Sequence, residues 1–218
     1  MSESVNPMDD LNDWFRSATQ ALIDIRNDAL RRVLNSEFDS ARWHPNGFAV
    51  FRLGEETLGR IRLHVWPTTR RVLVDNHPRV HCHDWDLASL ILAGSYSESL
   101  IELSHSVARQ QRVYHFDYTA EGLDRFVETT DLVSIREGPQ TESPPETFHY
   151  IPAGNFHITH VPSDTFAATL VMMSPPVRDV ITTLIGPAGF GSPILRRQDL
   201  TRPQVDAVVR ELGQALRP

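Results

Sequence analysis

The sequence predicts a mainly β protein: one β-sandwich or barrel with helices flanking it at both ends. Two observations predict this. From residue 48 to residue 173, short runs rich in Val, Ile, Leu, Phe and Tyr alternate with turn residues, which is typical of all-β sandwiches and barrels. Helical periodicity is confined to the two ends of the chain. Because no repeat, low-complexity tract or linker divides the 218 residues, we expect a single domain.

The N-terminal segment, residues 1–44, is predicted to be helical over 9–36 and to pack on the barrel. Asp9 or Asp10 can cap the start of this helix. Apolar residues then recur at spacings of three and four, which gives the helix one apolar face. These residues are Leu11, Phe15, Ala18, Leu22, Ile25, Ala29 and Val33. Residues 36–47 are expected to connect the helix to the barrel.

The barrel is expected over residues 45–175. Its predicted strands are 49–53, 60–66, 71–75, 79–83, 87–92, 96–103, 112–118, 132–135, 147–151, 156–161 and 167–173. We expect a short helix or loop over 121–130 and a loop over 138–146, because the latter stretch contains three prolines.

The C-terminal segment, residues 176–218, is predicted to be helical. A short helix is expected over 177–184 and ends at a Gly-Pro-rich turn. Thr201 and Gln204 have the spacing of a capping box, with Pro203 in the first turn of a last helix. The apolar face of that helix is expected to contain Val205, Val208, Leu212 and Leu216.

Composition excludes several classes of function. The net charge of −7 argues against a nucleic-acid or membrane-surface partner, since both favour concentrated positive charge. All 21 basic residues are arginine, so Schiff-base and P-loop lysine chemistries are excluded. The single cysteine, Cys82, excludes an intrachain disulfide and thiolate zinc clusters. Neither a signal peptide nor a membrane-length apolar run is evident, so we expect a cytoplasmic protein.

Histidine is the abundant metal-ligating residue type, at ten in the chain. His81 and His83 are two residues apart in a predicted strand, so both side chains should face one side while Cys82 faces the other. Residues 152–157 read Pro-x-Gly-x-x-His, in which a proline–glycine turn delivers His157 to the start of a strand. Gly94 ends the apolar run after His83 as a hairpin turn would. Coincidence without a metal remains the alternative interpretation of these histidines.

Together these motifs resemble those of the cupin superfamily. Its first motif is His-x-His, three or four residues, a glutamate, six residues and a glycine, and its second contains Pro-x-Gly-x-x-His. The matching residues are His81, His83 and Gly94, then Pro152, Gly154 and His157. The resemblance covers about residues 45–175. It implies a double-stranded β-helix (jelly-roll) barrel that binds a metal ion inside through His81, His83 and His157.

The chain departs from the cupin pattern at three points. The motif's glutamate would fall at Leu87, the asparagine that often follows the last histidine would be Val161, and an insertion is expected around 109–136. An apolar residue in place of the glutamate resembles the three-histidine cupins, of which cysteine dioxygenase is the best-known type. Residues 63–66 also look like that family. The serine–histidine–tyrosine arrangement of true cysteine dioxygenases has no match, so cysteine is not assigned as substrate.

The resemblance implies a mononuclear non-haem iron dioxygenase. Fe²⁺ is the expected metal, while Zn²⁺, Ni²⁺ or Mn²⁺ would also suit imidazole ligands. The expected partners are dioxygen and a small anionic substrate, which is a thiol, an enol or a carboxylate. The alternatives are an oxygen-independent metal-dependent isomerase or lyase and a non-catalytic ligand-binding cupin. A homodimer is expected because closed twofold assemblies are the commonest kind.

Several polar residues are candidates for substrate contacts. Arg60 and Arg62 share one strand face with His64 and Trp66, and an arginine inside the barrel would clamp a carboxylate. The alternative is that this face is solvated. Further candidates for orienting or acid–base roles are Arg52, Tyr96, Tyr114, His115 and Tyr150.

Two aspartates directly follow the histidine pair. Asp84 or Asp86 is expected to turn the chain, to orient a ligand imidazole or to supply a fourth ligand. Strand alternation predicts that Cys82 and His160 point away from the metal.

Overall fold

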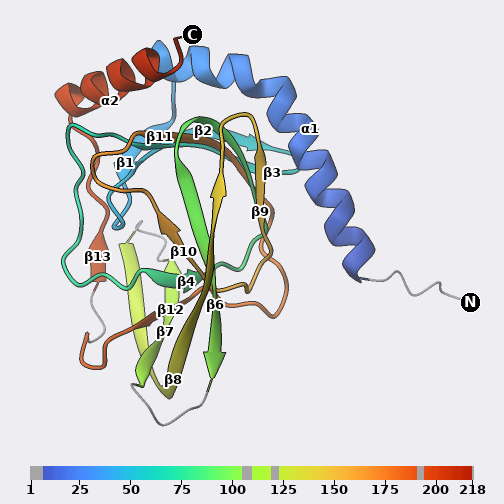
Figure 1. The fold of residues 1–218 in the computed structure, drawn as a ribbon, viewed down its shortest axis with the longest axis vertical. Helices are drawn as coiled ribbons and strands as arrows, with labels where there is room; N and C mark the ends of the chain where they lie inside the picture. Colours follow the sequence, from blue (N-terminus) through green and yellow to red (C-terminus); the bar gives the residue numbers. More distant parts are fainter. Residues whose placement is uncertain (1–6, 105–109, 119–122, 191–193, 218) are drawn as a thin grey trace, which may run out of the picture.

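The computed structural model describes residues 7–104, 110–118, 123–190 and 194–217, and it is mainly β with two helices (Figure 1). The helices are α1 (Pro7–Leu34) and α2 (Arg202–Ala215). The strands are β1 (Ser40–Trp43), β2 (Ala49–Glu56), β3 (Gly59–Trp66), β4 (Val80–Cys82), β5 (Leu87–Gly94), β6 (Tyr96–Ser104), β7 (Gln111–Tyr118), β8 (Leu123–Ser143), β9 (Phe148–Ile151), β10 (His157–His160), β11 (Ala167–Met173), β12 (Thr183–Gly186) and β13 (Ile194–Arg196). The prediction of a mainly β chain with terminal helices is confirmed.

The strands form two antiparallel sheets. The six-stranded sheet has the order β1-β2-β3-β11-β5-β9, and the seven-stranded sheet has the order β13-β8-β6-β10-β4-β12-β7. Both helices lie along the outer side of the sheet that contains β2, β3 and β11, with α2 at the top of Figure 1 and α1 running from the top down the right side, while β6, β7 and β8 extend to the opposite end. We call the face of the six-stranded sheet that is turned away from the helices its inner face.

The six-stranded sheet is covered by helices because its strands alternate between an apolar outer face and a more polar inner face. Ile61, Leu63 and Val65 of β3 are buried in one cluster with apolar residues of both helices. The helix residues in this cluster are Ala18, Leu22, Ala29 and Val33 of α1 and Val205, Val208 and Leu212 of α2. The intervening residues of β3 therefore point inward.

The predicted terminal helices are present, with small differences at their ends. Phe15 and Ile25 pack against the core from α1, as the periodicity indicates. The predicted cap at Asp9 or Asp10 and the predicted apolar contact of Leu11 depend on side chains that lie outside the described part of the chain. At the start of α2, the backbone N–H of Thr201 donates a hydrogen bond to Gln204 Oε1 at 2.8 Å.

The loop prediction for 138–146 and the helix or loop prediction for 121–130 are wrong over most of their lengths. Residues 123–143 form β8, whose first half pairs with β7 and whose second half pairs with β6. Gly138 and Pro139 are tolerated because the register shifts between Ser99 and Ile101 of β6, where a proline without an N–H breaks no ladder bond. The part of the prediction at residues 121–122 lies outside the described residues.

The short helix predicted over 177–184 is also wrong. Residues 183–186 form β12, which pairs with β4 on one side and β7 on the other. A run of β-branched residues at 180–183 favours a strand, and an eight-residue helix has few bonds to oppose that preference. The strand predicted at 71–75 is reduced to an isolated bridge between Leu73 and Asn46. Strands β1 and β13 were not predicted.

None of the helices in the described parts of the chain combines the length and the apolar character that crossing a bilayer requires.

Candidate metal centre

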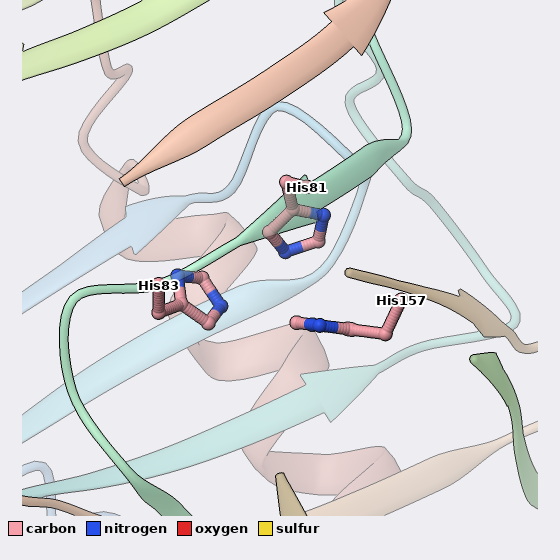
Figure 2. A group of neighbouring side chains, drawn as sticks. All are labelled: His81, His83 and His157. Atoms are coloured by element: carbon pink, nitrogen blue, oxygen red, sulfur yellow. The ribbon is translucent and has the colours of Figure 1, made fainter. Parts of the chain in front are cut away.

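Three histidine side chains converge between the two sheets. His81 lies on β4, His83 directly follows that strand, and His157 begins β10. One nitrogen atom from each imidazole lies within 4.8 Å of the others. Figure 2 shows the three rings turned toward one another, with ring centroids 4.4 to 5.2 Å apart. This prediction of a shared geometry is confirmed, and the group could hold a metal ion.

Local backbone structure explains how two distant segments meet. His81 is the direct cross-strand partner of His157, so their side chains lie on the same side of the sheet. The turn that precedes β10 contains Gly154 at φ +80°, a conformation that glycine adopts without strain. The Gly154 N–H donates a hydrogen bond to the His83 carbonyl oxygen at 2.8 Å. The turn is therefore tied to the segment that carries the other two histidines.

Backbone carbonyls orient two of the imidazoles. Nδ1 of His81 lies 2.8 Å from the Arg79 carbonyl oxygen, and Nδ1 of His157 lies 3.0 Å from the Asn155 carbonyl oxygen. A carbonyl only accepts, so each Nδ1 carries the proton and each Nε2 keeps its lone pair. This arrangement is the usual support of histidine ligands. Nδ1 of His83 is buried without a hydrogen-bond partner among the described residues. These donors fit a divalent ion.

Burial keeps the imidazoles of His81 and His83 neutral. Removal from water lowers the pKa of His81 to about 3, and the neighbouring His157 adds to this effect. Burial likewise lowers the pKa of His83 well below its usual value. Imidazole must be neutral to bind a metal, so these two residues are prepared for ligation across the physiological pH range.

The histidines line a small cavity of about 70 Å³, which we name the histidine cavity. The inner face of the six-stranded sheet contributes Arg62, His64 and Trp66, and the seven-stranded sheet contributes Tyr96. A water molecule needs roughly 10–15 Å³ of such volume, so the cavity has room for only a few atoms. Polar ligands and an aromatic wall together suit a small substrate.

The structure answers which way the arginines of β3 point. Arg62 lines the histidine cavity, whereas the guanidinium of Arg60 lies 5.0 Å from the ring centre of Trp85 and lines a neighbouring cavity. Both therefore lie on the inner face, and the alternative of a solvated outer face does not hold. A substrate role for Arg60 and Arg62 stays a prediction.

Of the three candidate tyrosines, Tyr96 lines the histidine cavity, whereas Tyr114 and Tyr150 are not among its lining residues. The Tyr114 hydroxyl donates a hydrogen bond to the Pro187 carbonyl oxygen at 2.7 Å. The Tyr150 hydroxyl donates to Asp86 at 3.2 Å, and its ring packs on Phe15 of α1 at 4.6 Å. Both hydroxyl groups are therefore engaged in contacts away from the three imidazoles.

The aspartates after the histidine pair hold the surrounding loops. Asp86 accepts a hydrogen bond from the Ala153 N–H at 2.9 Å, and Asp84 accepts one from the Thr182 hydroxyl at 2.7 Å. Neither carboxylate belongs to the three-histidine group. The imidazoles of His81 and His157 are instead oriented by backbone carbonyls, a role that sequence cannot reveal.

Cys82 and His160 are likewise engaged elsewhere. The buried Cys82 thiol lies 3.7 Å from the Ile181 carbonyl oxygen, and burial raises its pKa to about 11. Nε2 of His160 lies 2.9 Å from a Glu137 carboxylate oxygen. Both placements agree with strand alternation.

Sequence reasoning missed a buried polar network beside the cavity. The Tyr96 hydroxyl donates to Glu98 Oε2 at 2.5 Å, and His149 Nε2 lies 3.1 Å from the same oxygen. Burial raises the pKa of Glu98, but contacts with His149, the nearby His157 and Tyr96 outweigh it and leave the pKa lowered. The alternation of Tyr96 and Glu98 on β6 was a usable signal, whereas His149 comes from the other sheet.

Comparison with protein-family models and with curated proteins finds no match for this chain. The structure itself shows a mainly β chain with three convergent histidines that could bind a metal ion.

Proposed function

We propose that this chain is a mononuclear non-haem iron dioxygenase that acts on a small anionic substrate and is built on a cupin jelly-roll scaffold. The observation that carries the proposal is the group of three imidazoles, with no carboxylate among them, that lines a small cavity between two sheets. Sites with three protein ligands on one side and open positions on the other are typical of iron enzymes that use oxygen.

The ligand set favours an anionic substrate. Three neutral imidazoles cancel none of the charge of a divalent ion, so a thiolate, enolate or carboxylate would be attracted to it. When bound, Fe²⁺ would supply a redox-active centre with positions open to substrate and dioxygen. We therefore propose iron over the zinc, nickel and manganese that imidazole also accepts.

Residues of the chain would position the substrate. Arg62 lines the cavity, so its guanidinium can bind a substrate carboxylate through two hydrogen bonds. Phe48, Trp66 and Met173 form apolar parts of the wall and limit the entry of water. Burial raises the pKa of Tyr96 well above its usual value, so its hydroxyl remains protonated and bonded to Glu98.

The proposal is tested by oxygen consumption. Protein reconstituted with Fe²⁺ is expected to consume oxygen with at least one member of a panel of thiols, diketones and phenolic acids, and Zn²⁺ protein is expected to be inactive. His157→Ala should abolish the activity, whereas His160→Ala, which alters an imidazole outside the metal group, should retain it.

Three results would replace this proposal by an alternative. Turnover without oxygen in the Zn²⁺, Ni²⁺ or Mn²⁺ protein would indicate an isomerase or lyase that uses the ion as a Lewis acid. Ligand binding without turnover would indicate a binding protein. Failure to hold any metal would remove the catalytic centre altogether. We also propose a homodimer, which a sizing measurement tests.

A further inference from the structure

Asp86 lies where the two segments that carry the three histidines meet. It is three residues after His83 and is 6% exposed. Its Oδ1 accepts a hydrogen bond from the Ala153 N–H at 2.9 Å, and Ala153 belongs to the turn that precedes His157. The carboxylate therefore joins the segment that contains His83 to the turn that places His157.

The turn in its turn orients the His157 imidazole. The Asn155 carbonyl oxygen lies 3.0 Å from Nδ1 of His157. The Asn155 N–H donates a hydrogen bond to the Pro152 carbonyl oxygen at 3.2 Å, which closes the turn. A displacement of residues 152–155 would move this carbonyl and would rotate the imidazole whose other nitrogen faces the remaining two histidines. The position of the turn therefore sets the direction of one metal ligand.

Two neighbouring N–H groups of the turn donate to the histidine segment. Gly154 donates to the His83 carbonyl oxygen at 2.8 Å, and Ala153 donates to the Asp86 carboxylate. A single hydrogen bond would leave the turn free to pivot about it, whereas two fix its rotation as well as its distance. The bond to Asp86 has a charged acceptor, which strengthens it, and it is the one of the two that depends on a side chain.

The Asp86 carboxylate is itself held in place, so it can act as a fixed point. The Asp86 N–H donates a hydrogen bond to Ser174 Oγ at 2.9 Å, and the Ser174 N–H donates to the Asp86 carbonyl oxygen at 3.0 Å. The Tyr150 hydroxyl donates to the same carboxylate oxygen as Ala153 does, at 3.2 Å. The Tyr150 ring packs on Phe15 of α1, with ring centroids 4.6 Å apart. Asp86 is thus anchored both to the end of β11 and, through Tyr150, to α1.

We propose that Asp86 is a positioning residue for the metal centre, whose carboxylate fixes the turn that places His157 against the segment that carries His83. Asp86 is not one of the three grouped ligands, so its contribution comes from position and not from a bond to the ion. Groups that orient metal ligands from behind typically contribute about 10–100-fold to metal affinity. This inference rests on the proposed function for the presence of a metal ion, but it is independent of iron, oxygen and any substrate.

Two substitutions separate position from charge, with Co²⁺ as the probe and a competing chelator to measure its dissociation constant. Asp86→Asn removes the charge but keeps an oxygen at the same place, so it is expected to weaken binding by about threefold or less. Asp86→Glu keeps the charge but moves the oxygens by one carbon–carbon bond, so it is expected to weaken binding by about tenfold or more. Asp86→Ala, which removes the acceptor without adding bulk, should match Asp86→Glu and is titrated alongside in case one variant folds poorly.

The visible spectrum of bound Co²⁺ is the second measurement, because it depends on the number and arrangement of the ligands. The spectrum should change in Asp86→Glu and Asp86→Ala and should be unchanged in Asp86→Asn. Urea unfolding of the metal-free variants reports separately on the fold. Asp84→Glu is the matched control, because Asp84 is even nearer to His83 in the chain, but its carboxylate accepts a hydrogen bond from Thr182. It should bind Co²⁺ as the unmodified chain does.

Unchanged Co²⁺ affinity in a folded Asp86→Glu or Asp86→Ala variant would overturn the inference. So would an equal loss in Asp86→Asn, which would indicate charge, or in Asp84→Glu, which would indicate any change beside His83. A chain that binds Co²⁺ without dependence on residue 86 keeps the proposed metal centre and loses this inference. The expected losses at residue 86 in a chain that consumes no oxygen with Fe²⁺ would keep the inference and remove the dioxygenase. An unmodified chain that binds no metal ion would remove both.

Discussion

The half-buried imidazole of His77 is expected to make the folded chain sensitive to acid. The His77 ring packs edge-on against the Phe126 ring, with the ring centroids 5.7 Å apart. Its Nδ1 is buried without a hydrogen-bond partner among the described residues. Burial, together with the charge of Arg197, lowers the pKa of His77 to about 4. In the unfolded chain the same imidazole would titrate near its ordinary value of about 6.5.

The sign of the effect follows from proton linkage. Between pH 6.5 and 4 the unfolded chain binds a proton at His77 that the folded chain does not, so acid favours unfolding. The stabilisation by the neutral imidazole is complete above pH 6.5 and is lost as the pH falls toward 4. These two pKa values give a loss of about 2 kcal/mol of unfolding free energy between pH 7.5 and pH 5.

Urea unfolding of the metal-free protein at pH 7.5 and pH 5 measures this loss. His77→Gln is expected to reduce the pH-dependent loss by about 2 kcal/mol relative to the unmodified chain. Other buried histidines, such as His64 with its pKa lowered by burial to about 3, will maintain part of the acid sensitivity in the variant. His115→Gln is the control, because that imidazole is exposed on β7.

Two results would refute this reasoning. One is an unchanged loss of stability in His77→Gln. The other is an equal reduction in the His115→Gln control, which would show that burial is not the cause.

Three further substitutions test the packing by urea or thermal unfolding. Gly94→Ala should destabilise the chain by more than about 2 kcal/mol, because this residue has φ +80° and an added Cβ would lie 1.8 Å from the Phe166 carbonyl oxygen. A variant as stable as the unmodified chain would contradict the turn geometry. Leu170→Ala removes a fully buried side chain from the core under the helices and should cost about 2–5 kcal/mol, and a loss below about 1 kcal/mol would argue against that burial. Glu98→Gln should cost about 2 kcal/mol, because it removes the charged acceptor of the Tyr96 hydroxyl, and an unaffected unfolding midpoint would show that the network is not stabilising.

Much of the fold could be predicted because local patterns and tertiary structure agree. The apolar face predicted from the helical periodicity of α1 and the apolar face predicted from the alternation of β3 are both present in the structure, because both pack into the same core. The prediction failed where pairing overrode a local signal. Residues 183–186 form a strand because they pair with both β4 and β7. Gly138 and Pro139 lie inside the long strand β8 because its pairing with β6 shifts register at that point.

The convergence of the three histidines was predictable, whereas the surroundings of the site were not. His81 and His83 are two residues apart, on β4 and directly after it, so alternation predicts that they face the same side. The turn before His157 has its own sequence signature. The arginines of β1, β2 and β3 line one cavity only because these three strands lie side by side in a fixed register, and Arg197 joins that lining from a segment more than a hundred residues from β3. The position of these side chains relative to one another is set by strand pairing and not by any local sequence pattern.

Metal stoichiometry tests the central claim most directly. Elemental analysis of the chain reconstituted with Fe²⁺ is expected to find one metal ion per chain. His81→Ala, His83→Ala and His157→Ala should each lose it, whereas His160→Ala should keep it. A reconstituted chain that holds no Fe²⁺, Zn²⁺, Ni²⁺ or Mn²⁺, or a His157→Ala variant that retains full occupancy, would contradict the account.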